Sequence, residues 1–143
     1  MILVPYTISN YNQVLKIFES NIPDFFHPSE KKEFSDFLMA TTIEFYILIN
    51  NDQIIGAGGI GLNSDETVSL CWGMIHKSHH NNKYGKFLLQ ERIRLIQKKF
   101  PGKKIVSNTS QITEGFFRKF GFNTVQSEDN YWAPGIHLRK MIL

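Results

Sequence analysis

The stretch Cys71–Leu89 reads CWGMIHKSHHNNKYGKFLL and joins a predicted strand, a polar loop and a predicted helix. The strand is predicted from residues 68–74, where small or polar residues alternate with Val68, Leu70, Trp72 and Met74. This alternation predicts a β-strand that places those four side chains on one face. The polar run HKSHHNNK then separates the strand from the helix.

The helix is predicted from its apolar stripe. Leu89, Ile93, Ile96 and Phe100 recur at spacings of 4, 3 and 4 residues, which is typical of an amphipathic helix over 83–99. The first turn of a helix has backbone N–H groups without partners and the positive end of the helix dipole. A strand followed by a polar loop and a helix start is therefore suited to bind a phosphate-bearing anion.

Three residues at this helix start support an anion site. Gly85 lets the backbone approach a ligand closely, and Lys83 and Lys86 add positive charge. A solvated connecting loop is the alternative interpretation of the same residues.

The run 80–89, HNNKYGKFLL, resembles the pyrophosphate loop of the GCN5-related N-acetyltransferases (GNAT), in which Arg/Gln-x-x-Gly-x-Gly/Ala precedes an apolar helix. Gly85 keeps the pattern, whereas His80 stands where Arg or Gln is usual and Lys83 where the first Gly is usual. Downstream, the run 115–122, GFFRKFGF, is similar to the family's Leu-Tyr-x-Lys-x-Gly-Phe helix and turn. With the two motifs in order, the resemblance covers nearly the whole chain and looks like a bacterial branch of the family.

The resemblance implies that acetyl-CoA is the co-substrate. Its pyrophosphate would lie on the loop, and its pantetheine arm between the fourth and fifth strands, which splay apart in the family. Ser110 stands where the family often has an Asn that touches this arm. The implied cofactor-binding residues are Met74 and Ile75 through their backbone, His80, Asn81, Asn82, Lys83, Tyr84, Gly85, Lys86, Ser110, Phe117 and Lys119.

Phe117 departs from the family in a chemically important way. A Tyr frequently stands there and protonates the departing thiolate, but a Phe has no proton to give. Either another group supplies the proton, or the thiolate leaves unaided.

Transfer to an amine requires a group that accepts a proton, because only the neutral amine attacks a thioester. Histidine is the natural base near pH 7. The candidates are His137 at the start of the last strand, His27 in a connector and Glu66 at the far end of the fourth strand, with Tyr131 as a candidate acid. Each of them can also be read as an ordinary surface or core residue.

A group of side chains is predicted to lie in connectors, where the resemblance places the acceptor pocket. It comprises Phe25, Phe26, His27 and Trp132, with Tyr131 beside them. Aromatic side chains in loops favour an acceptor with an apolar part.

Two other chemistries are weaker interpretations. His76, His79 and His80 form an HxxHH pattern, but no carboxylate or thiolate completes it, so we expect no metal. Cys71 lies in mid-strand without an adjacent base and is predicted to be a small core residue rather than a nucleophile.

Composition sets outer limits. The 143 residues, 42% of them hydrophobic, predict one domain over 1–143. The net charge of +3 suits a phosphate-bearing ligand but is too small to argue for nucleic acid. One cysteine fits a reducing cytoplasm. Neither a signal peptide nor a membrane span is expected.

Read along the chain, the pattern predicts an α/β (α+β) fold of order β-α-α-β-β-β-α-β-α-β-β. The sheet is expected to be mixed and mostly antiparallel, with six to seven strands and helices on both faces. The third strand is rich in glycine, which weakens it unless something needs its surface bare. Predicted strands are 2–8, 43–49, 53–62, 66–75, 104–107, 122–126 and 136–142; predicted helices begin near 10, 28, 83 and 113, the last capped by Thr109 and Ser110, and a loop covers 127–135.

These observations favour a cytoplasmic, acetyl-CoA-dependent N-acetyltransferase that acts on a primary amine of a small molecule or peptide. The alternative is a GNAT-fold module that binds acetyl-CoA as a sensor or regulator, which Phe117 and the missing first Gly motivate. A small basic nucleic-acid binder rests on charge alone. The apolar end Met141-Ile142-Leu143 is compatible with a homodimer, and the acceptor and the acyl-group preference stay open.

Overall fold

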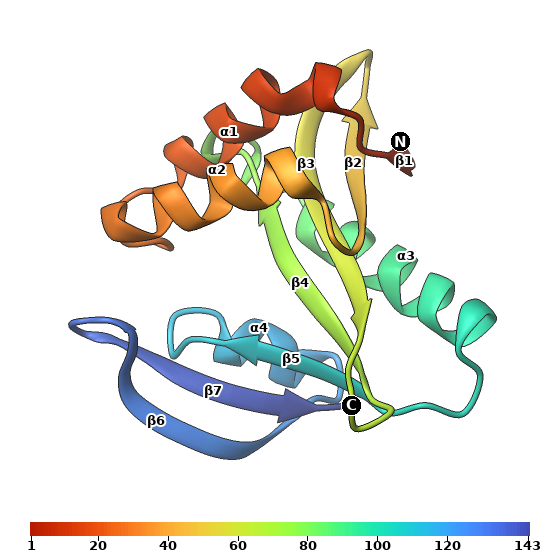
Figure 1. Cartoon of the computed structure of the whole chain (residues 1–143), viewed down its shortest axis with the longest axis vertical. Coiled ribbons are helices and arrows are strands. Elements are labelled where there is room, and N and C mark those ends of the chain that lie inside the picture. Colours follow the sequence, from red (N-terminus) through yellow and green to blue (C-terminus); the bar gives the residue numbers. More distant parts are fainter.

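The computed structural model describes all residues from Met1 to Leu143. Its strands form one seven-stranded sheet in the order β1-β2-β3-β4-β5-β7-β6 (Figure 1). All neighbouring pairs are antiparallel except β4 with β5, so the predicted fold class and element order are confirmed. The strands are β1 (Ile2–Pro5), β2 (Glu44–Asn50), β3 (Gln53–Leu62), β4 (Val68–Ile75), β5 (Ile105–Thr109), β6 (Asn123–Ala133) and β7 (Ile136–Ile142).

Helices lie on both faces of the sheet (Figure 1). On one face, α1 and α2 bury aromatic and aliphatic side chains against β2, β3 and Met74. On the other, α3 and the aromatic residues of α4 pack with Phe122 and Met141. None of the helices is long and apolar enough to cross a membrane. The helices are α1 (Tyr11–Ser20), α2 (Lys31–Ala40), α3 (Tyr84–Lys99) and α4 (Glu114–Lys119), with single 3₁₀ turns η1 (Ile8–Asn10), η2 (Pro28–Glu30) and η3 (Lys77–His79).

The β4 and β5 strands run together for only three residues. Their parallel pairing begins at Val68 with Ile105 and ends at Leu70 with Ser107. Beyond that point β4 continues to Ile75 beside β3, while β5 follows β7 to Thr109. The divergence is visible in Figure 1 and confirms the splay that the resemblance implied.

A β-bulge interrupts β4 where the divergence begins. Cys71 pairs with Gly59 and Met74 with Ala57, so Gly58 faces two residues, Trp72 and Gly73. Trp72 has a φ of 48°. Bulky residues rarely adopt this left-handed conformation, and here the bulge imposes it.

The bulge corrects the predicted face of β4. The alternation placed Val68, Leu70, Trp72 and Met74 together. In the structure Val68 and Leu70 pack on the α3 face, whereas Trp72 and Met74 pack against the α1 and α2 cluster. One extra residue shifts the side-chain period, so the residues beyond it change face.

The prediction of a loop over 127–135 is wrong. Most of it belongs to β6, which reaches Ala133, and only Pro134 and Gly135 turn the chain into β7. The β6 strand is almost entirely exposed, and its pairing with β7 is irregular between Glu128 and Ala133. A strand with two solvated faces lacks the alternation by which strands are recognised.

Two element boundaries are also corrected. The first strand ends at Pro5, not residue 8, because the chain turns into η1 at Ile8. Ser110 does not cap α4: the N-cap is Thr113, and the Ser110 hydroxyl accepts the N–H of Ile112 before the helix begins. The end of the chain is part of the sheet, since Met141 is fully buried and Leu143 N–H donates to the Ile105 carbonyl at 3.0 Å.

The end of β4 is attached to α1 by a buried amide. The Asn21 side chain, 2% exposed, donates from Nδ2 to the carbonyls of Ile17 and Ile75, both at 2.9 Å. This pair of hydrogen bonds links the end of α1 to the residue where β4 ends.

Replacing Asn21 with Ala leaves two buried carbonyls with one donor fewer. We expect Asn21→Ala to lower the free energy of unfolding by about 1–3 kcal/mol, measured by urea denaturation. The exposed Asn123→Ala serves as the control, with a change within about 0.5 kcal/mol. Equal stabilities of the two variants would show that this link contributes nothing.

Candidate functional site

The polar loop and the first turn of α3 form an open helix N-terminus. Lys83 occupies the N-cap position with a φ of 63°, no side chain caps the helix, and its first turn contains no acidic residue. Asn81 is likewise left-handed, with a φ of 65°. The helix therefore presents its N–H groups and its positive dipole end without a side-chain anion of its own.

His80 holds this loop against the end of β4. Its Nε2 lies 2.8 Å from the Ile75 carbonyl, which can only accept, so this nitrogen carries the proton. The ring also meets Phe25 edge-on at a centroid distance of 5.1 Å. The residue that replaces the family's usual Arg or Gln thus acts here as a link between loop and strand.

The loop and α4 lie against each other. A Cβ built on Gly85 would be 3.7 Å from the ring of Phe116, so the backbone of Gly85 faces α4. Phe117 packs edge-on with Phe116 and Phe122, both at 5.4 Å. The structure therefore brings together the two motifs that are far apart in the sequence.

The positively charged residues of the predicted set stay in solvent. Lys83, Lys86 and Lys119 are exposed, and none of them forms an ion pair with a carboxylate. Two residues of the set are engaged within the loop region: Tyr84 Oη accepts from Asn50 Nδ2 at 3.2 Å, and Asn82 Nδ2 donates to the His80 carbonyl at 3.3 Å. The three ammonium groups are free for an anionic ligand.

Met74 and Ile75 are both buried at the end of β4. The Ile75 carbonyl already accepts from Asn21 and His80, which fills both of its lone pairs. A ligand N–H that donates to this strand must therefore use a carbonyl other than that of Ile75.

His137 is the second residue of β7 and the candidate base. Its Nδ1 accepts the backbone N–H of Asn130 at 2.9 Å and lies 3.9 Å from a carboxylate oxygen of Asp129. With Nδ1 accepting, the proton of the neutral ring is on Nε2. To accept a proton, His137 would first have to release Asn130.

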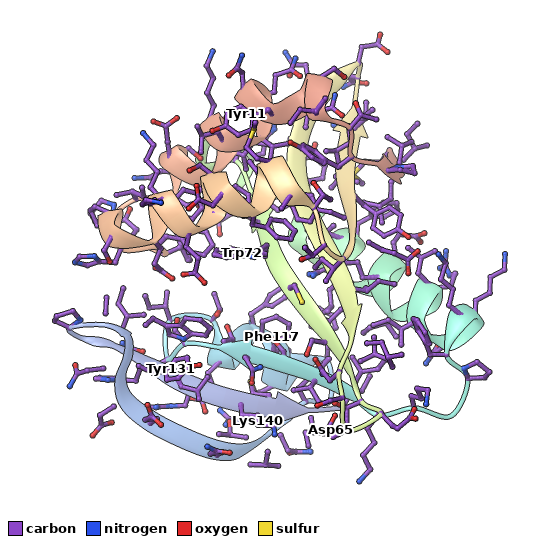
Figure 2. All side chains as sticks on the ribbon, viewed as in Figure 1. Tyr11, Asp65, Trp72, Phe117, Tyr131 and Lys140 are labelled. Atoms are coloured by element: carbon purple, nitrogen blue, oxygen red, sulfur yellow. The ribbon has the colours of Figure 1, made fainter.

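Tyr131 and Trp132 lie on β6, not in a connector. Tyr131 is 51% exposed and packs edge-on against Trp132 at 4.9 Å. The Trp132 indole donates to the Thr109 carbonyl at 3.1 Å, at the last residue of β5. This pair therefore borders the diverging end of β5; in Figure 2 Trp72 lies beside the helical layer and Tyr131 in the β6–β7 hairpin.

The remaining candidates are dispersed. Glu66 lies in the exposed turn before β4, paired with Lys103, at the end where β4 and β5 are still joined. His27 caps η2, because its Nδ1 accepts the Ser29 N–H at 3.1 Å. Phe26 stacks on Phe18 at 4.6 Å. Of these, only Phe26 approaches the divergence, through its contact with Trp72.

Sequence reasoning missed Trp72 and Arg92. Trp72 packs on Phe34 at 4.9 Å, so its side chain covers β4 on the α1 and α2 face. Arg92 lies on α3 with 3% exposure, beneath the bulge on the opposite face. The available signal was the glycine content of β3, which indicated a need for bare surface without naming its cause.

Burial shifts the pKa values of Cys71 and His76. Burial raises the pKa of the Cys71 thiol, so the thiolate is disfavoured at neutral pH. Burial, with smaller contributions from His79 and His80, lowers the pKa of His76.

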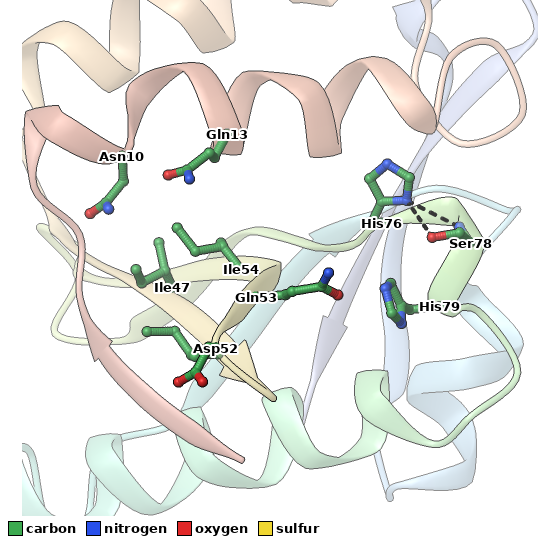
Figure 3. Close-up of a pocket in the computed structure, with 10 residues that line it drawn as sticks. Asn10, Gln13, Ile47, Asp52, Gln53, Ile54, His76, Ser78 and His79 are labelled. Carbon is green, nitrogen blue, oxygen red and sulfur yellow. Dashed lines mark hydrogen bonds between the residues drawn. The ribbon is translucent and has the colours of Figure 1, made fainter.

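A separate hollow lies between α1, the β2–β3 hairpin and η3 (Figure 3). In it His76 accepts from the Ser78 N–H at 3.1 Å. The hollow shares no residue with the predicted cofactor set. Its lining residues are Asn10, Gln13, Ile47, Ile49, Asp52, Gln53, Ile54, His76, Ser78 and His79.

The comparisons with known proteins point to the same family that the two sequence motifs resemble. The model of the acetyltransferase (GNAT) domain family matches residues 13–143. A GNAT-family protein from Desulfovibrio desulfuricans superposes with a TM-score of 0.83 at 17% identity, over 99% of this chain and 97% of its own. No curated protein matches the sequence.

Two further solved structures contain a ligand. An aminoglycoside 6′-N-acetyltransferase complexed with coenzyme A has a TM-score of 0.77 at 15% identity, over 100% of this chain and 96% of its own. The protein yncA from Salmonella typhimurium, with its cofactor acetyl-CoA, has a TM-score of 0.74 at 15% identity, over 100% and 92%. At these identities the likeness establishes the fold.

The left-handed backbone at Lys83 predicts a contrast with Lys86 three residues later. Lys83→Gly relieves a conformation that costs an L-residue about 1–2 kcal/mol but adds chain entropy, so we expect stability unchanged or higher by up to about 1 kcal/mol. Lys86→Gly lies within the helix and should lower stability by about 0.5–1 kcal/mol. Urea denaturation of both variants measures the contrast, and equal losses would argue against the left-handed turn.

Proposed function

Because the chain belongs to the GNAT acetyltransferase family, we propose that it transfers the acetyl group of acetyl-CoA to a primary amine of a small molecule or peptide. The observation that carries this proposal is the uncapped, acid-free N-terminus of α3 beside the end of a strand that has parted from its neighbour. The single cysteine suits a reducing cytoplasm, where we place the reaction.

The residues present fit coenzyme A. Backbone N–H groups of Tyr84, Gly85 and Lys86 would hold the pyrophosphate at the helix N-terminus, with Lys83 and Lys119 adding charge from two sides. The extended pantetheine arm would lie along β4, where β5 no longer occupies the edge. Coenzyme A or acetyl-CoA is bound in two of the similar structures, which supports the same ligand here.

The proposed chemistry is a direct displacement. The neutral amine nitrogen attacks the thioester carbon, and the new C–N bond forms. The C–S bond breaks, and its electron pair leaves with sulfur as a thiolate. The nitrogen gives up one proton to become the amide, and the thiolate takes one up. The protein contributes mainly by holding the two reactants together and by directing a β4 N–H near Met74 at the carbonyl oxygen, where negative charge develops.

The acceptor would reach the thioester from the side of Trp72. That side is bordered by α1 and α2, with Phe26 and Phe34 against the indole, and by the β6–β7 hairpin with Tyr131 and Trp132. Its aromatic character supports an acceptor with an apolar part. For the group that accepts the proton of the ammonium we propose His137 ahead of Glu66, because Glu66 lies at the joined end of the strands. Tyr131 stays the candidate acid.

The second candidate function is a sensor that binds acetyl-CoA without turnover. Phe117 favours it, since the ring packs among other aromatic residues and offers no proton. A homodimer would also serve such a role; β1 and β6 are the edge strands through which a partner could extend the sheet. Saturable binding with no release of free thiol over a broad panel of amines would favour this candidate.

The central test of ligand placement is Gly85→Glu. A carboxylate at this helix start repels the pyrophosphate and occupies the dipole end, so acetyl-CoA affinity should fall by more than about tenfold, measured by isothermal titration. Gln90→Glu adds the same charge on an exposed position of the same helix and should leave affinity within about twofold. Unchanged binding in Gly85→Glu would place the ligand elsewhere.

Phe117→Tyr separates the two candidate functions. If the thiolate leaves unaided in the wild type, restoring a phenol should raise kcat by about tenfold or less, because acid catalysis adds little for an acidic thiol. Release of free thiol from acetyl-CoA with an amine panel measures it. A wild type without turnover that becomes active in this variant would support the sensor instead.

A further inference from the structure

Arg92 is buried where a charge is unusual. It lies on α3 and is 3% exposed. Its guanidinium fills space that two glycines leave open: a Cβ built on Gly73 would lie 2.5 Å from Nη2, and one on Gly58 would lie 3.0 Å from Cζ and Nε. The bare surface of β3 and β4 at this point is therefore the space that Arg92 requires.

This charge has no carboxylate partner. Nη1 donates to the carbonyls of Gly59 and Cys71 at 3.3 and 3.4 Å, and Nε has no hydrogen-bond partner. Burial lowers the Arg92 pKa to about 10, so the group stays charged at neutral pH. An unpaired buried cation is costly to folding, and such a cost is expected where the group serves another purpose.

The position of Arg92 coincides with the predicted position of the thioester. The four steps from Ile75 back to Cys71 span about 13 Å of strand, comparable to an extended pantetheine arm. With the pyrophosphate at the start of α3, the arm therefore ends beside Cys71, Trp72 and Gly73. The guanidinium lies directly beneath that bulge.

The hydrogen bond to Cys71 reaches the opposite end of the same peptide group. The Cys71 carbonyl and the Trp72 N–H belong to one amide, and a donor on the carbonyl polarises the amide and strengthens its N–H as a donor. The left-handed backbone of Trp72 marks this peptide as the one the bulge reorients.

We propose that Arg92 is a positioning residue for acyl transfer: by donating to the Cys71 carbonyl it orients and polarises the Cys71–Trp72 peptide, whose N–H holds the thioester oxygen. This inference rests on the proposed function and moves the oxygen-binding donor from the neighbourhood of Met74 to Trp72. The full positive charge beneath the bulge also stabilises the negative charge that develops on that oxygen.

A purely structural Arg92 would behave differently. If it only filled space, its loss would reduce stability and ligand affinity together. A buried ion replaced by an apolar side chain of similar size often leaves stability unchanged or raised. Arg92→Met should therefore retain the thermal midpoint, whereas Arg92→Lys keeps the charge and should retain part of the function.

The experiment is isotope-edited infrared spectroscopy of bound acetyl-CoA labelled with carbon-13 at the thioester carbonyl. We expect the wild type to lower the carbonyl stretching frequency, Arg92→Met to lose most of that downshift with the dissociation constant within about threefold, and Arg92→Lys to restore part of it. Arg94→Met is the control, because Arg94 is exposed and paired with Glu91 on the same helix; it should keep the full downshift.

An equal downshift in wild type and Arg92→Met would overturn the proposal, as would parallel losses of stability and affinity in Arg92→Met. If the wild type binds acetyl-CoA without any downshift, the proposal also fails. Absence of acetyl-CoA binding to the wild type would instead contradict the proposed function on which it rests.

Discussion

The candidate site depends on the divergence of β4 and β5, whose ends are each held by side chains and not by each other. At the end of β4, the Ile75 carbonyl is held by Asn21 from α1 and by His80 from the polar loop. At the end of β5, the Thr109 carbonyl is held by the indole of Trp132. Backbone polar groups need partners, and these two carbonyls find them in side chains from α1, the polar loop and β6 and not in the neighbouring strand.

Three features that reduce the stability of the fold lie close to this divergence. Lys83 takes a left-handed backbone conformation at an uncapped helix start, Trp72 takes another within the bulge, and Arg92 is buried without a carboxylate partner. Each choice reduces stability relative to an ordinary strand-loop-helix unit. The open N-terminus of α3 and the guanidinium of Arg92 supply positive potential at the helix start and beneath the bulge.

Sequence patterns recovered what depends on local periodicity. The α3 stripe at Leu89 and Ile96 is buried as predicted, Phe45 and Tyr46 of β2 face opposite layers, and the loop before Gly85 leads into the helix. They failed where one residue changes the period: the bulge at Trp72 moves Met74 to the other face, and no alternation marks it in advance.

The prediction also missed most of the exposed β6 strand, for a related reason. Its polar residues are supported by hydrogen bonds to β7 rather than by burial, so Tyr131 and Trp132 were assigned to a connector. Arg92 lay outside the predicted set because an arginine on an amphipathic helix is usually solvated. Only the three-dimensional position of Gly58 and Gly73 shows that its side chain turns inward.

The central claim is that acetyl-CoA lies along β4 from the start of α3 to the bulge. Titrating the nitrogen-15-labelled protein with acetyl-CoA and following every backbone amide by two-dimensional NMR tests it most directly. The account predicts that the largest shifts fall on two segments, Cys71–Ile75 and Asn82–Lys86, with Gln13, Gln53 and His79 of the separate hollow unaffected. Shifts concentrated in that hollow, with the β4 amides unchanged, would contradict it.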